Sequence, residues 1–293
     1  MPSWILDDDD KKSESESATI PNIIESNTRD YIPMPRRLSL RSIEREGIGY
    51  RDGYATLEAL FAPEASPGRI LFPMIDVRVH HLYNDQYAFN VGLLTRYIPK
   101  TLCQIFGFNI YYDYRQGELG NYQRLGVGGE ILGERWDFRI NGYIGGQRHS
   151  HKCVFDQFVG GFYAIFREKE YSFQGFNAEI GSFLVKSRSN KFLLYAAAGP
   201  YYLSGQDDGR AWGGRIRVRP QYKDYLSLEL SSSYDHIFKT IFQGEVIFNL
   251  PLYKFSKKNK KASTCASSRQ IYQPVERFEI IPLKGHCGWE KNW

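Results

Sequence analysis

The fold class can be read from residues 109–146, NIYYDYRQGELGNYQRLGVGGEILGERWDFRINGYIGG. In three short runs, an apolar residue alternates with a charged, polar or small one. Successive side chains of a β-strand point to opposite faces of the sheet, so a period of two residues gives each strand one apolar and one polar face. The segment therefore predicts three consecutive strands, and it raises the question of what covers their apolar face.

The same alternation extends over residues 49–254. In residues 226–231, for example, leucines alternate with Ser227, Glu229 and Ser231. Turn-forming residues separate the runs, at 84–85, 117–120, 133–134 and 207–209. No helical period of 3.6 residues continues for more than two turns. Repeated strands with short turns predict an all-β chain built as an antiparallel meander.

Composition divides the 293 residues into three parts. Residues 1–48 are polar, with an aspartate run and a serine–glutamate repeat, and such a segment is predicted to be disordered because it cannot bury a core. Residues 49–254 form the predicted barrel domain. Residues 255–293 begin with a basic run, interpreted as a solvated linker, and continue as a short mixed tail.

Charge and cysteine spacing narrow the possible partners. The formal net charge is +5, and no Lys/Arg cluster is interleaved with aromatics, so no nucleic-acid partner is predicted. The cysteines at 103, 153, 265 and 287 match no zinc motif, and neither a metal nor another cofactor is expected. Cys265 and Cys287 could close a loop within the tail. No run of about 20 apolar residues predicts a membrane helix, which leaves a barrel open.

Catalysis is one rival class of function. His80 and His236 lie near the carboxylates of Asp76 and Asp235, but no serine in a strained glycine-rich turn accompanies them. We therefore predict no catalytic residue and no enzyme. A soluble β-barrel that binds a ligand, and an outer-membrane pore of unrelated function, stay open as alternatives.

Two architectures fit the alternation. In a soluble barrel the apolar faces point inward, whereas in a membrane barrel they point to lipid and the polar faces line a wet lumen. The second is favoured because many runs have about 9–13 residues, enough for a tilted strand that crosses a bilayer. Charges of both signs lie in mid-strand, and aromatic residues gather at strand ends. The residues predicted to face lipid are Leu125, Val127, Phe138 and Ile140.

Several motifs, in order, resemble the inverse autotransporter β-domain, the barrel of the intimin and invasin family. They are YDY at 112–114, RLGVGGE at 124–130, NGY at 141–143, GFNAEIGSF at 175–183, RIRVRPQYKDYLSLEL at 215–230 and QPVERFEIIPLK at 273–284. The resemblance implies an outer-membrane barrel of about 12 strands with both ends on the periplasmic side. It also implies a linker that threads back through the lumen and carries a C-terminal passenger to the cell surface.

The resemblance assigns two sets of residues. The lumen-facing set is Arg124, Glu130, Asp137, Arg139, Arg215, Arg217 and Glu229. The pore-linker set is Gln273, Pro274, Val275, Glu276, Arg277 and Glu279. We expect the linker to plug the pore, with a flexible tail outside the barrel as the alternative.

The sequence departs from the family pattern at both ends. No signal peptide is visible at the N-terminus, which suggests a start farther upstream. The chain ends a few residues after the linker match, too soon for an immunoglobulin-like domain of ~100 residues. We therefore expect a barrel without a passenger, a barrel that works with a separately encoded passenger or surface protein, or a fragment.

The strand count depends on residues 153–166, CVFDQFVGGFYAIF. They are either a barrel strand or the tip of a long hairpin. If they are a tip, RRLSLRSIE at 36–44 becomes the candidate for the missing strand.

Overall fold

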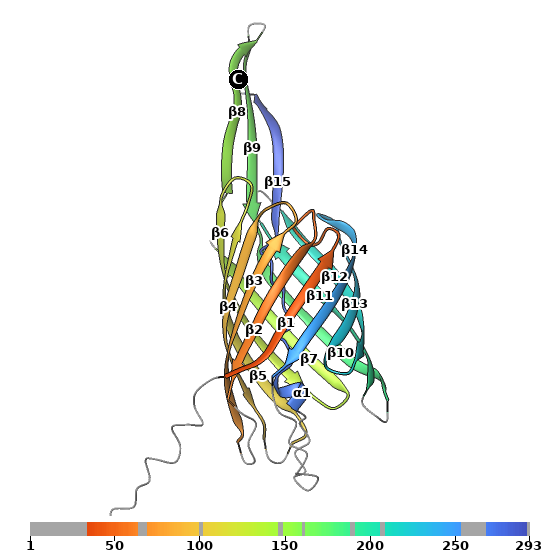
Figure 1. Cartoon of the computed structure of the whole chain (residues 1–293). Coiled ribbons are helices and arrows are strands. Elements are labelled where there is room, and N and C mark those ends of the chain that lie inside the picture. Colours follow the sequence, from red (N-terminus) through yellow and green to blue (C-terminus); the bar gives the residue numbers. More distant parts are fainter. Residues whose placement is uncertain are drawn as a thin grey trace, which may run out of the picture. The chain divides into compact units, whose positions relative to one another are not determined.

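The computed structural model describes residues 34–63, 69–99, 102–145, 149–159, 162–187, 191–205, 209–252 and 268–291. Twelve strands close into an antiparallel barrel (Figure 1). They are β1 (Met34–Glu44), β2 (Tyr54–Ala62), β3 (Leu71–Leu82), β4 (Tyr87–Tyr97), β5 (Ile105–Gln116), β6 (Asn121–Leu132), β7 (Trp136–Gly145), β10 (Gln174–Lys186), β11 (Phe192–Ser204), β12 (Arg210–Tyr222), β13 (Leu226–Asp235) and β14 (Lys239–Pro251). The predicted fold class and strand count are confirmed.

Closure of the barrel comes from the first and last strands. β1 pairs with β14 from Arg37 opposite Pro251 to Glu44 opposite Gly244. Because the number of strands is even, β1 begins and β14 ends at the same rim, which we call the lower rim, as Figure 1 is drawn. The upper rim carries the connections from β1 to β2, from β3 to β4 and from β5 to β6.

The barrel begins earlier in the chain than the predicted boundary at residue 49. Met34–Glu44, assigned to the disordered segment, is strand β1. Its inner face carries Arg37, Ser39 and Arg41, so its sequence has a polar composition. In the structure the strand is nevertheless paired with β14 on one side and β2 on the other. The rest of the segment, residues 1–33, lies outside the described residues.

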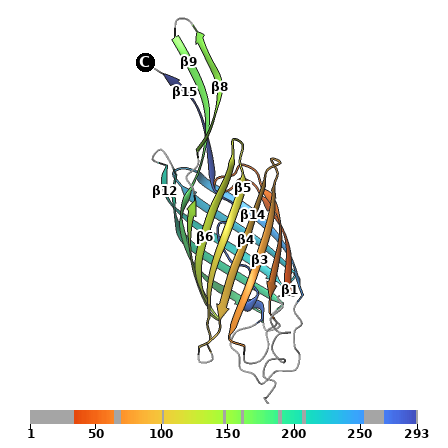
Figure 2. The same cartoon turned by 90° about the vertical axis from the view of Figure 1, so that its left-hand side faces the viewer.

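The hairpin alternative for residues 153–166 is confirmed. β7 pairs directly with β10, and the chain between them forms β8 (His149–Val159) and β9 (Phe162–Ser172), which leave the barrel at the upper rim (Figure 2). The C-terminal strand β15 (Leu283–Lys291) pairs with β9, giving a three-stranded sheet in the order β15-β9-β8. This sheet is separate from the closed barrel.

The two faces of the barrel follow the alternation in the sequence. In β6 and β7, Leu125, Val127, Phe138 and Ile140 are exposed on the outside, with 42%, 36%, 49% and 58% of their surface accessible. Polar side chains at the intervening positions are buried inside. The apolar face is thus left for lipid to cover. Among the described residues, no helix is long and apolar enough to cross a bilayer.

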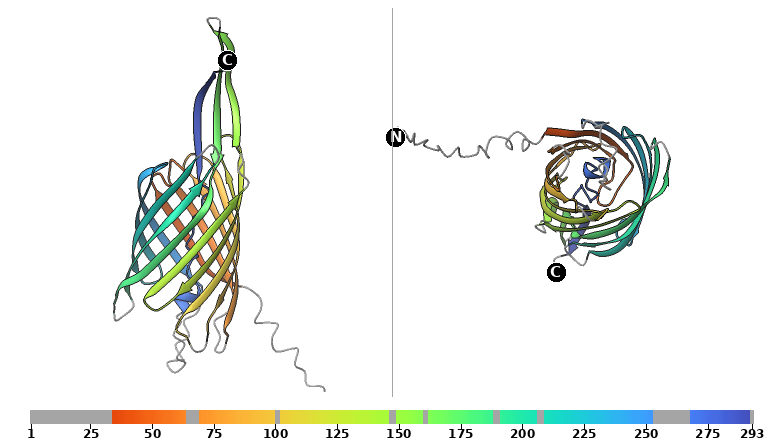
Figure 3. Two further views of the ribbon diagram at one scale, coloured as in Figure 1. Left: turned by 180° about the vertical axis from the view of Figure 1, so that it is seen from behind. Right: turned by 90° about the horizontal axis from the view of Figure 1, so that it is seen from below.

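A segment of the chain runs through the inside of the barrel. The short helix α1 (Ser268–Ile271) lies within the ring of strands at the lower rim, as the view from below in Figure 3 shows. From there residues 272–282 rise through the lumen without helix or strand and join β15 beyond the upper rim (Figures 1 and 3). We call residues 272–282 the lumen segment.

Candidate functional site

The lumen segment is buried along most of its length. Tyr272, Val275, Ile280 and Ile281 are almost inaccessible to solvent, and Arg277 and Glu279 are also buried. A buried extended chain has no intrachain partner for its peptide groups, so the surrounding wall must supply hydrogen bonds. The site is therefore the interface between this segment and the inner face of the barrel.

Arg277 of the lumen segment is held by a carboxylate of the wall. Its Nη1 and Nη2 donate to Oδ1 and Oδ2 of Asp113, at 2.8 and 2.6 Å. Arg124 donates to the same carboxylate through Nε, at 2.9 Å. A Cβ on Gly126 would lie 2.5 Å from Arg277 Nη2, so the glycine of the RLG motif makes room for the guanidinium. Paired fork-shaped contacts of this kind are among the stronger charge-assisted hydrogen bonds.

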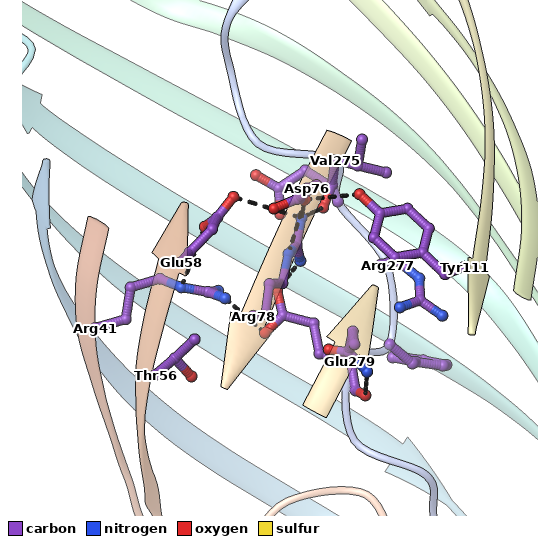
Figure 4. A network of polar contacts seen from close by, with 12 residues as sticks. Arg41, Thr56, Glu58, Asp76, Arg78, Tyr111, Val275, Arg277 and Glu279 are labelled. Carbon is purple, nitrogen blue, oxygen red and sulfur yellow. Dashed lines mark hydrogen bonds and ion pairs between the residues drawn. The ribbon is translucent and has the colours of Figure 1, made fainter. Parts of the chain in front are cut away.

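Glu279 accepts from two arginines, one on β1 and one on β3 (Figure 4). Arg41 Nη2 donates to its Oε2 at 2.6 Å, and Arg78 Nη1 donates to Oε1. Arg78 also donates to Asp76 and lies near Glu58, so the pair belongs to a network that joins β1, β2 and β3. Removing Glu279 would leave two buried cations with fewer counter-charges.

Glu276 reaches the opposite side of the barrel. It accepts from Arg217 Nη1 at 2.9 Å and from Arg219 Nη1 at 2.6 Å, both on β12. Arg217 also donates to Glu179 and Glu229. The carboxylate thus bridges the lumen from the segment to β12.

A glycine and a tyrosine complete the wall near Arg78. Asp76, Gly92 and Tyr111 lie side by side on β3, β4 and β5. The Tyr111 ring crosses over Gly92 and donates its hydroxyl to Asp76 Oδ2 at 2.7 Å, while Arg277 lies over the ring, 4.3 Å from its centroid. A Cβ on Gly92 would meet the ring at 2.2 Å. Only glycine leaves room for this crossing.

The lower end of the lumen is filled by apolar packing around α1. Ile271, Tyr272 and Val275 are buried in one cluster with inward side chains of β2 to β6 and of the loop after β4, including Leu60, Phe72, Met74, Leu94, Ile98, Ile105 and Leu132. Arg96 Nη1 donates to the carbonyls of Gln270 and Gln273, at 3.3 and 2.9 Å, and also to that of Ile271. The last carbonyls of a helix lack partners within it, so Arg96 closes the end of α1.

Small cavities remain beside the lumen segment, lined mainly by β10 to β14 and by β1. One of about 90 Å³ near the lower rim is lined by Arg37, Arg139, Tyr195 and Arg219 together with Glu276. Another of about 60 Å³ toward the upper rim is lined by Arg41, Tyr50, Arg215 and again by Glu276. Glu276 lines both cavities, and the same side chain forms the ion pairs with β12.

The structure places the predicted lumen residues on the inner face. Arg124, Glu130, Asp137, Arg139, Arg217 and Glu229 are buried there, and Arg215 is partly exposed. Arg124 and Arg217 contact the lumen segment directly. The others pair with one another or with further wall residues, as Glu130 does with Arg96 and Arg139 with Asp137.

Of the predicted linker residues, the charged ones make the ion pairs described above and Val275 is packed at the lower end. Gln273 is held through its carbonyl, and Pro274 borders the larger cavity.

Several functional residues were missing from the predicted set. Arg41 lies on β1, which the composition predicts to be disordered. Glu58 lies on β2, where Leu60 and Ala62 also face inward and weaken the alternation. Asp76, Arg78 and Asp113 alternate with apolar residues in the sequence, so they lie on the polar faces of their strands. The signal for their role was available, since a mid-strand charge in a closed barrel needs a counter-charge in the lumen.

The groups considered for catalysis have other partners. His80 is bonded to Thr56 and to Asn90, and Asp235 accepts from Tyr201 and from the amides of the β13–β14 turn. Among the described residues no group of three or more metal-binding side chains is present. Cys103 takes part in a disulfide, whereas Cys265 and the side chain of Cys287 lie outside what the structure describes.

The fold and the threaded lumen define a class, the membrane β-barrels with an internal polypeptide segment. Residues 52–162 match the family model of the inverse autotransporter β-domain. This confirms the resemblance over the first part of the barrel: the protein is an outer-membrane β-barrel similar to the inverse autotransporter β-domain. The matched residues run from before β2 into β9, and the motifs after residue 162 lie outside the match.

Several solved structures are matched at low sequence identity, and the match with a TM-score above 0.5 shows the same fold. One, from work on the in-meso crystallization of membrane proteins, is 14% identical with a TM-score of 0.57 and covers 85% of this chain and 100% of its own. Omp33 of Acinetobacter baumannii is 10% identical (TM-score 0.38; 75% and 99% covered), and the β-domain of the Bordetella autotransporter BrkA is 12% identical (TM-score 0.29; 75% and 97% covered). Among curated proteins, none matches the sequence.

Proposed function

We propose that the barrel anchors this protein in the outer membrane and that its lumen is the passage by which C-terminal polypeptide reaches the cell surface. The observation that supports this most directly is the lumen segment, which follows α1 at the lower rim and leads to β15 beyond the upper rim. The proposed role is that of an anchor and conduit, not of an enzyme.

The proposal assigns a side to each rim. Bacterial barrels have an even number of strands, with both ends in the periplasm and the longer loops outside. The lower rim, where β1 begins and β14 ends, is then periplasmic. The sheet of β8, β9 and β15 stands on the cell surface. It would be the point from which a passenger extends, either continuous with β15 or separately encoded and bound there.

Surface display tests the proposal. An epitope attached after Trp293 is expected to bind antibody on intact cells. The matched control carries the same epitope between residues 64 and 68, which join β2 to β3 at the lower rim, and is expected to bind only after permeabilisation. Binding to the control alone on intact cells would reverse the orientation and contradict the proposal.

A further inference from the structure

The wall holds the main chain of the lumen segment through a series of side-chain donors. Arg37 donates to the carbonyl of Tyr272, Arg96 to those of Gln270, Ile271 and Gln273, Arg78 to Val275, Asn141 to Glu276, Arg124 to Phe278, Asn90 to Glu279 and Arg115 to Ile281. The series continues from the lower rim almost to the upper one.

These donors solve a problem that every extended chain in a barrel has. The peptide groups of the barrel strands are used in their own ladders, so they cannot pair with a chain in the lumen. Arginine and asparagine side chains reach past the ladder and carry several N–H groups each. A main-chain carbonyl is the same at every residue, so contacts of this kind do not read a sequence.

All of these donors come from one half of the wall. They lie on β1, β3, β4, β5, β6 and β7, whereas the other half, β10 to β14, contacts the segment through the side chains of Glu276 and Phe278. The cavities described above are lined mainly by residues of β10 to β14 and the segment, with residues of β1, β2 and β7 at their margins. The segment thus lies against β1 to β7, and more space remains between it and β10 to β14.

Some N–H donors on the inner face of β1 to β7 are not used by the segment. Nη2 of Arg96 and Nε of Arg115 are buried and have no acceptor among the described residues. Arg96 and Arg115 are themselves buried, 0% and 4% accessible, and each already donates to more than one carbonyl. A chain shifted by a residue would find other N–H groups of the same side chains.

We propose that the inner face of β1 to β7 is a binding track for extended polypeptide, held by its main-chain carbonyls and tolerant of its side chains. The ligand class is any unfolded chain in the lumen, of which residues 272–282 are the resident example. The inference rests on the proposed conduit function and adds how the conduit holds its cargo. The ion pairs of Glu276, Arg277 and Glu279 then fix the position of the resident segment and are not required for its retention.

Thiol labelling of the full chain tests the track. Ile280 is 3% accessible, so a reporter Ile280→Cys is shielded while the segment stays in place. In the wall variant, Asn90→Ala with Asn141→Ala removes donors to Glu279 and Glu276. We expect labelling by a water-soluble maleimide to be roughly 30-fold faster, since each hydrogen bond lost is worth about a factor of five.

Two further variants carry the same reporter. In the segment variant, Glu276→Gln, Arg277→Gln and Glu279→Gln neutralise the charges but keep every carbonyl, and labelling is expected to stay slow. The control Ser39→Ala with Asn249→Ala removes a polar pair that the wall makes with itself, 2.6 Å between the two side chains, and is also expected to stay slow.

The outcomes are decisive in either direction. Fast labelling of the wall variant alone supports the track. Unchanged protection of the wall variant, or labelling of the segment variant as fast as that of the wall variant, overturns it. The epitope after Trp293, read on the same cells, reports on the conduit function independently, so loss of display with normal protection would count against the proposed function and not against the track.

Discussion

Arg277 and Asp113 form a two-point ion pair inside the barrel, although 164 residues separate them in the chain. Asp113 is on β5 and is completely buried, and its carboxylate also accepts from Arg124 and Asn90. One wall carboxylate therefore joins three neighbouring strands to the lumen segment. It thereby sets the position of Arg277 within the lumen.

Replacing Asp113 is expected to be costly. Asp113→Ala leaves Arg124 and Arg277 buried side by side without their shared counter-charge, and breaking a buried pair in this way costs about 3–5 kcal/mol. Urea unfolding of the protein in lipid vesicles measures the change. The exposed Asp52→Ala serves as control and is expected to change stability by less than about 0.5 kcal/mol. Equal stability of the two variants would mean that Asp113 does not join the parts.

The lipid-facing surface can be tested at Ile140, in the middle of β7. Ile140→Arg puts a charge near the centre of the bilayer and is expected to destabilise the barrel by ~2–4 kcal/mol. The same charge at Tyr225→Arg, next to the β12–β13 turn, is expected to cost about 0–1 kcal/mol. Both residues are more than half exposed in the absence of lipid, so the difference measures depth in the membrane. Equal costs would contradict the orientation.

The crossing of Tyr111 over Gly92 predicts a contrast between two glycines. Gly92→Ala brings a Cβ within 2.2 Å of the ring and is expected to cost about 1–3 kcal/mol. Gly142→Ala, on β7, meets nothing within 4 Å and is expected to be neutral or slightly stabilising. Unfolding midpoints of both variants check this, and a Gly92→Ala protein as stable as Gly142→Ala would show that the ring moves aside freely.

Glu170 fastens the outer sheet to the barrel. Its carboxylate accepts from the amides of Glu118 and Leu119, at 3.2 and 3.0 Å, and from the Tyr122 hydroxyl at 3.0 Å. In Glu170→Ala the two amides lose a charged acceptor, so we expect their hydrogen exchange to accelerate at least about tenfold. Glu168→Ala on the same strand is the control. Unchanged exchange at both amides would show that the β5–β6 turn is held by other contacts.

The lumen segment is expected to close the pore to ions. In planar bilayers the full chain should conduct weakly, because buried side chains fill the lumen between two small cavities. A chain truncated after Ser256 lacks α1 and the lumen segment and should conduct several times more. Equal conductance of two correctly folded chains would contradict the plug.

The barrel could be predicted from sequence because alternation over whole strands is a strong signal. The prediction was wrong for β1. Its residues Arg37, Ser39 and Arg41 face inward and the preceding residues are also polar, so the sequence of this strand predicts disorder. The role of β8 and β9 could not be decided, since a hairpin outside the ring has the same period as a strand within it. Only the pairing of β7 with β10 separates the two.

The site was less predictable than the fold. Mid-strand charges such as Arg124 and Asp137 indicated a lumen, but a charge pattern does not say which partners meet across it. The pairs Arg78–Glu279 and Arg217–Glu276 join residues far apart in the chain, and they depend on the depth to which the segment is threaded. The carbonyl contacts leave no trace in the segment's own residue types, because every residue has a carbonyl.

The pairing of β1 with β14 around the lumen segment has a mechanical consequence. A chain that passes through a ring made by its own earlier residues is interlocked with that ring. Either the ring closes around the segment, or the segment is drawn through the finished ring as a loose strand. A compact domain is wider than the interior of a barrel of this size, so in the second case a domain attached beyond β15 would have to cross before it folds. Once folded, such a domain would be too wide to return through the barrel, and the lumen segment would be retained in place.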